Sequence, residues 1–136
     1  MAVVGKSVPR LDGPEKVTGN ARFVADVANS ETLWVKFVRS PFPHARVTSI
    51  DFSAIETMPG VRAFLSGEDV KSLRGGNLYA DEPILASWDK VRFIGDKVAA
   101  IAADTKEIAE DAIKLVKVTY DELPAVFEPE QAAAPG

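Results

Sequence analysis

The hydrophobic and polar positions of the chain change pattern most sharply in its last third. Three apolar residues, Val91, Phe93 and Ile94, precede the turn-forming pair Gly95-Asp96. A continuous apolar run, VAAIAA, follows at residues 98–103. Short apolar runs bounded by turn residues are typical of strands buried on both faces. The pattern therefore predicts a strand, a glycine turn and a second, fully buried strand.

A helical pattern follows. Thr105 is a suitable N-cap, and Glu107 lies in the first turn, where a carboxylate suits the positive end of a helix. Apolar residues then recur near helical spacing: Ile108, Ala109, Ala112, Ile113, Leu115 and Val116. These positions predict one main helix at about 104–116, with its apolar side against a sheet.

Residues 117–121 alternate with period two, which is typical of a strand covered on one face. The pattern stops at Leu123-Pro124. A strand, a helix and a return strand joined by short connections predict a βαβ-like or split βαβ unit.

Two further strands are predicted upstream. Residues 33–39 are rich in aromatic and β-branched side chains, and a Pro-rich corner separates them from an extended pattern at 44–51. We expect these two strands to pair around the corner. Alternation within the second strand places Ala45, Val47 and Ser49 on one face and Arg46, Thr48 and Ile50 on the other.

Short helical turns are predicted on either side of a third upstream strand. Asp51 or Ser53 can cap a turn that Pro59-Gly60 ends. A strand at 61–65 follows, and Ser66 can cap a second helical turn. The elements together predict the α+β class, with a small mixed sheet, one main helix and one or two short helical turns.

The ends of the chain lack this periodicity. Residues 1–28 combine turn signals with scattered charges and predict an irregular arm that docks on another domain; a solvated loop is the alternative. Residues 29–127 form the predicted domain, and residues 128–136, rich in Glu, Pro and Ala, predict a linker or tail.

Composition narrows the function classes. The 136 residues are 46% hydrophobic and 26% charged, as in an ordinary single globular domain. A net charge of -4 and a pI of about 5.0 give no electrostatic basis for binding nucleic acid or an anionic membrane. The absence of cysteine excludes disulfides, thiolate metal sites and iron–sulfur ligation by this chain.

No signal peptide or transmembrane segment is evident in the sequence. We therefore expect a cytoplasmic location, with export by a signal on a partner subunit left open.

Candidate catalytic residues are few. His44, the single histidine, has no carboxylate at a spacing that clearly meets it, so we expect a structural or exposed role. Asp81 and Glu82 are neighbours whose side chains face opposite ways on an extended chain. Gly75-Gly76 is more typical of a flexible loop than of a phosphate-binding loop, because no strand and helix flank it.

The remaining candidates are also better explained by structure. No glycine elbow or nearby base activates a serine at any of the three positions considered, Ser40, Ser66 and Ser87. Trp34 is predicted in the core and Trp88 at an interface. Lys97 follows a glycine turn, but the methionines and symmetric halves of a biotinyl or lipoyl domain are absent. We therefore assign no catalytic, cofactor-binding or metal-binding residue.

Four stretches of the sequence together resemble a known domain. They are VGKSVPRLDGPEKVTGNARFVADV at 4–27, VRSPFPHARVTSID at 38–51, PGVRAFLSGEDV at 59–70, and KVRFIGDKVAAIAADTKEIAEDA with VTYDELPAVFEPEQA at 90–112 and 118–132. In order and spacing they resemble the N-terminal α/β-hammerhead domain of the molybdopterin-binding large subunit in the xanthine dehydrogenase, aldehyde oxidase and carbon monoxide dehydrogenase family.

The resemblance implies a structural and interaction domain of a molybdenum hydroxylase large subunit. It places the molybdenum-molybdopterin cofactor, the catalytic glutamate and the substrate contacts in later domains of that subunit, and iron–sulfur and FAD groups in partner subunits. The full assembly would hydroxylate an aldehyde or N-heterocycle, or oxidise CO. The glycine-rich cofactor motifs of the later domains are absent here, so turnover by the isolated chain is not expected. A stand-alone binding or carrier module with the same fold and no molybdenum is the alternative.

Overall fold

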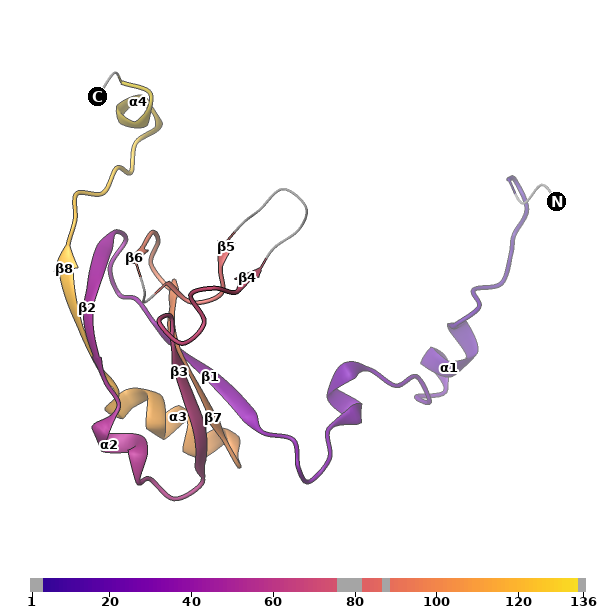
Figure 1. The fold of residues 1–136 in the computed structure, drawn as a ribbon. Helices are drawn as coiled ribbons and strands as arrows, with labels where there is room; N and C mark the ends of the chain where they lie inside the picture. The colour runs from indigo at the N-terminus through magenta and orange to yellow at the C-terminus, as the bar shows by residue number, and fades with distance from the viewer. Residues whose placement is uncertain (1–3, 76–81, 87–88, 135–136) are drawn as a thin grey trace. The chain divides into compact units, whose positions relative to one another are not determined.

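The computed structural model describes residues 4–75, 82–86 and 89–134 (Figure 1). The chain divides into two compact units, Met1–Thr32 and Leu33–Gly136. The first unit contains two short helices that the sequence patterns did not predict, α1 (Gly13–Val17) and the 3-10 helix η1 (Val24–Val27). Pro14 lies in the first turn of α1, where its missing N–H costs no hydrogen bond.

The second unit is built on two three-stranded sheets. One has the strand order β1-β7-β3, formed by Trp34–Arg39, Lys97–Ala103 and Val61–Ser66. The other has the order β6-β2-β8, formed by Lys90–Val91, Ala45–Asp51 and Lys117–Glu122. A two-stranded ladder joins β4 (Arg74–Gly75) to β5 (Glu82–Pro83).

The α+β class is confirmed. The main helix, α3 (Lys106–Leu115), lies within the predicted range, and the Thr105 hydroxyl accepts a hydrogen bond from the Ile108 N–H as an N-cap should. Shorter helices are α2 (Ser53–Glu56) and α4 (Pro129–Ala132). The predicted single mixed sheet is divided in two, and the pairings between described strands are all antiparallel.

The predicted pairing of residues 33–39 with 44–51 is wrong. β1 pairs with β7 and β2 pairs with β6 and β8, so the two strands belong to different sheets (Figure 1). The corner between β1 and β2 does not form a hairpin turn, and it is hydrogen-bonded to the turn at residues 95–96. Ser40 donates its N–H to the Asp96 carbonyl at 2.9 Å, and its own carbonyl accepts the Gly95 N–H at 2.8 Å.

The strand–helix–strand unit also spans both sheets. β7 lies in one sheet and β8 in the other, with α3 between them in the chain, so the unit is not a βαβ crossover within one sheet. The strand predicted before Gly95 is shorter than expected, because β6 ends at Val91 and Phe93 and Ile94 lie in the following turn. Gly95, with φ +91°, supplies a backbone conformation that other residues rarely adopt.

A bulge changes the predicted faces of β2. The register between β2 and β8 shifts between Val47 and Ser49. Beyond this irregularity Ile50, rather than Ser49, is turned toward the apolar interior, where it packs against core residues together with Val47. A bulge inserts a residue into the alternation and so reverses the faces that follow it.

The helical turn predicted at Ser66 is also wrong. Residues 67–72 form turns, and the Asp69 carboxylate accepts hydrogen bonds from both the N–H and the hydroxyl of Ser66, at 2.7 and 2.8 Å. The turn predicted near Asp51 is confirmed as α2, where the Asp51 carboxylate accepts the Ser53 N–H at 2.9 Å. The predicted end of this turn is at Pro59-Gly60, and Gly60 there has a positive φ of +84°.

The core consists of two apolar clusters. The first contains Ala45, Ala86, Val91 and Val98, and the second contains Ile55, Ile101, Ala112 and Val116. Ile50 and Val118 pack against both clusters and so connect them. α3 contacts β1 and β7, and its buried alanines, Ala109 and Ala112, allow a close approach to the sheet. Across the described ranges, no helix has the length and apolarity to cross a membrane.

Candidate docking site

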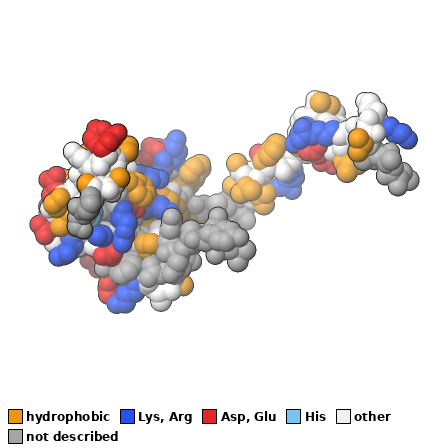
Figure 2. Space-filling view, turned by 90° about the horizontal axis from the view of Figure 1, so that it is seen from above, with side chains coloured by type: hydrophobic (Ala, Val, Ile, Leu, Met, Phe, Trp, Pro, Cys, Tyr) orange, Lys and Arg blue, Asp and Glu red, His pale blue; other side chains and the backbone are white. Residues whose placement is uncertain are grey.

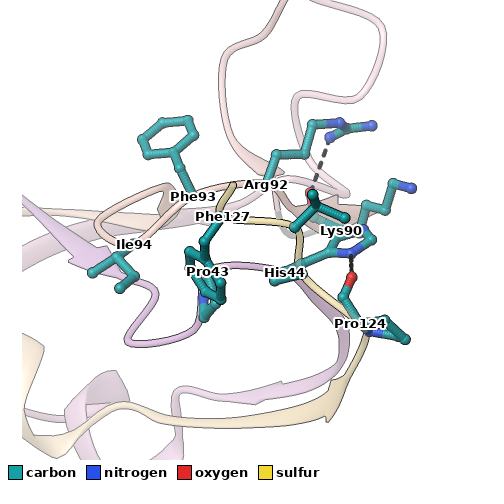
Figure 3. A pocket seen from close by; sticks show the side chains of 10 residues that line it. Pro43, His44, Lys90, Arg92, Phe93, Ile94, Pro124 and Phe127 are labelled. Carbon is teal, nitrogen blue, oxygen red and sulfur yellow. Dashed lines mark hydrogen bonds between the residues drawn. The ribbon is translucent and has the colours of Figure 1, made fainter. Parts of the chain in front are cut away.

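A pocket of roughly 590 Å³ opens where three segments distant in sequence meet (Figure 3). The segments are the corner before β2, the turn after β6, and the chain that leaves β8. The lining residues are Pro43, His44, Lys90, Arg92, Phe93, Ile94, Pro124, Ala125, Val126 and Phe127.

His44 connects the corner to the outgoing chain. Its Nδ1 lies 2.6 Å from the Pro124 carbonyl oxygen and donates to it, as the dashed line in Figure 3 shows. One further backbone hydrogen bond extends the β2–β8 ladder: the Leu123 N–H donates to the His44 carbonyl at 2.9 Å. No carboxylate within the described segments forms an ion pair with His44. The geometry therefore gives His44 a positioning role at residues 123–124, and offers no partner that would make it a general base.

The cationic side of the pocket is partly neutralised. Arg92 forms an ion pair with Asp89 and also donates to the Lys90 carbonyl at 3.0 Å. The buried Asp96 carboxylate accepts the Arg92 N–H at 3.1 Å, which fixes the turn that carries these residues. Arg92 is thus committed to local contacts.

The opposite side of the pocket is apolar. In Figure 3, Phe93 and Ile94 lie on one side, away from Lys90 and Arg92. Four large side chains around the pocket, Phe93, Ile94, Val126 and Phe127, are each more than half exposed. A cluster of exposed apolar side chains beside a few polar groups is typical of a docking surface. The sequence patterns missed this cluster, although two large apolar residues directly before a glycine turn are a usable signal.

The other candidates do not converge on this pocket. Ser40 is buried, and its hydroxyl exchanges hydrogen bonds with the backbone of Phe42. Ser66 is bound by Asp69. Lys97 begins β7, with its ammonium 5.7 Å from the centre of the Phe37 ring. Gly75 belongs to β4.

The core position predicted for Trp34 is wrong, since its side chain is 51% exposed. Trp34 is the first residue of β1, which is an edge strand of its sheet. Gly76, Asp81, Ser87 and Trp88 lie outside the described residues, as does the side chain of Glu82.

The arrangement offers no clear ligand set for a metal or a phosphate-bearing cofactor. In the segments that the structure describes, no three histidine, cysteine, aspartate or glutamate side chains are grouped to hold a metal ion. The pocket also suits a phosphate group poorly, because Arg92 is already paired with Asp89 and the opposite wall of the pocket is apolar.

Comparison with known proteins identifies the fold. Residues 18–124 match the family described as "Aldehyde oxidase and xanthine dehydrogenase, a/b hammerhead domain". This chain belongs to that family. The match confirms the resemblance drawn from the sequence, and it makes the chain a domain of the kind found in molybdenum hydroxylase large subunits.

Similar proteins are several times longer than this hammerhead chain. It is 42% identical to a probable xanthine dehydrogenase subunit of Bacillus subtilis, covering 93% of this chain and 17% of that protein. It is 37% identical to the nicotinate dehydrogenase large molybdopterin subunit of Eubacterium barkeri, covering 96% and 31%. The crystal structure of quinoline 2-oxidoreductase from Pseudomonas putida 86 aligns with a TM-score of 0.84 at 38% identity, covering 96% of this chain and 18% of that one.

Proposed function

We propose that this hammerhead domain is a docking and framing module of a molybdenum hydroxylase large subunit. The observation that carries the proposal is the coverage: the relatives match more than nine-tenths of this chain, whereas this chain spans only 17% and 31% of the two relatives above. The greater part of each relative therefore lies in other segments, and the matched domain is one small part of each of those polypeptides.

The chemistry of the proposed assembly resides in those other segments. The remaining domains of the large subunit hold the molybdenum-molybdopterin cofactor. Partner subunits hold the iron–sulfur and FAD groups. The full assembly hydroxylates an aldehyde or N-heterocycle, or it oxidises CO. The structure supports a non-catalytic role for this part, because the pocket residues are used for positioning and for apolar contacts. In this proposal residues 1–28 are a docking arm and residues 128–136 a linker or tail.

The test uses two purified polypeptides. One is this chain, and the other comprises the remaining large-subunit domains without the hammerhead domain, called here the remainder polypeptide. We expect the two to form a complex with one copy of each, measured by size-exclusion chromatography with light scattering. Failure of the two to associate, together with binding of a small ligand by this chain alone, would establish the stand-alone module instead.

A further inference from the structure

The β1-β7-β3 sheet has one face that α3 does not cover. Directly opposed residues of antiparallel strands share a face. Val38, Phe64 and Ile101 lie in the cluster that includes residues of α3, and Lys36 pairs with Glu110 of α3 at 2.8 Å, so these residues mark the inner face. The pairings Val35↔Ala102↔Ala63 and Phe37↔Ala100↔Leu65 form two rows on the other side. We call these six residues the outer face.

The outer face is entirely apolar, although it is accessible. Val35 is 52% exposed and Leu65 44%, Ala63 is also exposed, and the other three residues are half-buried. An antiparallel sheet with one solvated face normally alternates apolar with polar residues. The sequence predicted a fully buried strand at residues 98–103, but in the structure Ala100 and Ala102 on the outer face of β7 are only half-buried.

The shape and charge of the outer face indicate what can cover it. Three alanines lie among Val35, Phe37 and Leu65, so another element can approach the backbone of the sheet closely. The Arg39 guanidinium and the Lys97 ammonium lie 5.8 and 5.7 Å from the centre of the Phe37 ring. Neither cation has a carboxylate partner within residues 4–75, 82–86 and 89–134. Arg39 also donates a hydrogen bond to the Gly95 carbonyl at 2.7 Å, which holds it at this end of the face. One end of the apolar face is therefore flanked by positive charge that no carboxylate of the described residues neutralises.

We propose that the outer face of the β1-β7-β3 sheet is the main surface on which the remainder polypeptide packs. The partner surface is apolar, with a carboxylate that meets Arg39 or Lys97. This inference rests on the proposed function and adds the surface to it. The relatives show that a large amount of polypeptide accompanies this domain in one chain. A second copy of the domain fits less well, because its own outer face would bring the same cations and no carboxylate.

The decisive variant is Leu65→Lys, with Leu115→Lys as the matched control. Both leucines are almost equally exposed, 44% and 45%, but Leu115 lies at the end of α3 rather than on the outer face. Lysine is well tolerated on an edge strand such as β3. We expect both isolated variants to unfold at the wild-type temperature. Leu65→Lys should weaken binding of the remainder polypeptide at least tenfold, measured by titration calorimetry, and Leu115→Lys should leave it unchanged.

A second variant tests the charge at the edge of the face. Lys97→Gln should weaken binding at low salt, and the difference from wild type should shrink as salt is added, because screening removes the attraction between separated charges.

The possible results distinguish failure of the proposed docking surface from failure of the proposed function. If wild-type chain binds the remainder polypeptide and Leu65→Lys binds equally well, the outer face is not the docking surface, although the proposed function stands. If wild-type chain does not bind at all, the proposed function itself fails. If light scattering shows that the isolated chain is a dimer and that Leu65→Lys dissociates it, the face belongs to a second copy and the inference is overturned.

Discussion

Two glycines with positive φ fix turns of this domain, and Gly60 is the more constrained of the two. Its φ is +84°, and a Cβ added there would lie 2.5 Å from Cδ1 of Ile108 on α3. Gly95 also has a positive φ, +91°, but no atom lies within 4 Å of its added Cβ. Substitution of Gly95 by alanine therefore introduces backbone strain alone, whereas the same substitution at Gly60 adds a steric clash.

We predict that Gly60→Ala destabilises the domain more than Gly95→Ala does. Gly95→Ala should cost about 1 kcal/mol from strain alone, and Gly60→Ala about 2 kcal/mol because Ile108 must also move. Urea unfolding measures both. Ile108→Val removes the Cδ1 atom, so the excess cost of Gly60→Ala should largely disappear in the Ile108→Val background. An equal cost in both backgrounds would show that contact with Ile108 is unimportant.

A second residue-scale prediction concerns the ion pair between Arg62 and Asp104. Arg62 donates two hydrogen bonds to the Asp104 carboxylate, at 2.7 and 2.8 Å, and these bonds lower the pKa of Asp104 below its ordinary value of 3.8. A carboxyl group with a lowered pKa stabilises the fold above its unfolded-state pKa, and this stabilisation is lost as the pH falls through the folded-state pKa.

Both Asp104→Asn and Arg62→Gln should therefore reduce the loss of stability of the domain between pH 5 and pH 2. Urea unfolding at several pH values measures this slope. The effect should be small, because both side chains are solvent-exposed. A wild-type slope in both variants would contradict the assignment.

At the scale of elements, the sequence predicted strands and helices better than their partners. The period of the pattern and the Thr105 cap are local properties, so β7, α3 and β8 were placed correctly. Strand pairing depends on contacts that are distant in sequence. The corner after β1 binds the turn at 95–96 through Ser40, and no local pattern indicates this contact.

The Thr105 hydroxyl caps the N-terminus of α3. Thr105→Ala should destabilise the domain by about 1 kcal/mol, because the Ile108 N–H loses its hydrogen-bond acceptor. Thr105→Ser retains the hydroxyl and should remain within a few tenths of a kcal/mol of wild type. Thermal and urea unfolding measure both variants. If alanine and serine are equivalent at position 105, the hydroxyl does not cap the helix in solution.

The candidate pocket shows the same limit of local patterns. His44 is the only histidine of the sequence, and its role is to hold the carbonyl of Pro124, a residue 80 positions away. The sequence pattern predicts Phe93 and Ile94 as strand residues, and it gives no signal at Val126 and Phe127. Their gathering at one pocket depends on how β2, β6 and β8 pair, which single-sequence patterns do not specify.

At the scale of the whole molecule, the exposed apolar surface indicates that another polypeptide covers part of this chain. Val35 and Leu65 on the outer face are exposed, as are several apolar side chains of the first unit, among them Leu11, Val17 and Val24. Figure 2 shows hydrophobic side chains at the surface of both units. A domain that functioned alone would gain solubility from polar residues at these positions. Their retention is consistent with surfaces that other domains cover.

Residues 1–20 belong to the first unit, and we expect them to contribute to binding but not to the stability of the domain. Residues 33–136 form a compact unit of their own, so deletion of residues 1–20 should leave the unfolding midpoint of the domain close to the wild-type value. The same deletion should weaken binding of the remainder polypeptide, because the exposed apolar side chains Val8, Leu11 and Val17 are lost with it. Replacing residues 1–20 with a Gly/Ser segment of equal length controls for chain length and should weaken binding to the same extent. Calorimetric titration measures affinity and thermal unfolding measures the fold; unchanged affinity in both variants would show that the arm does not dock.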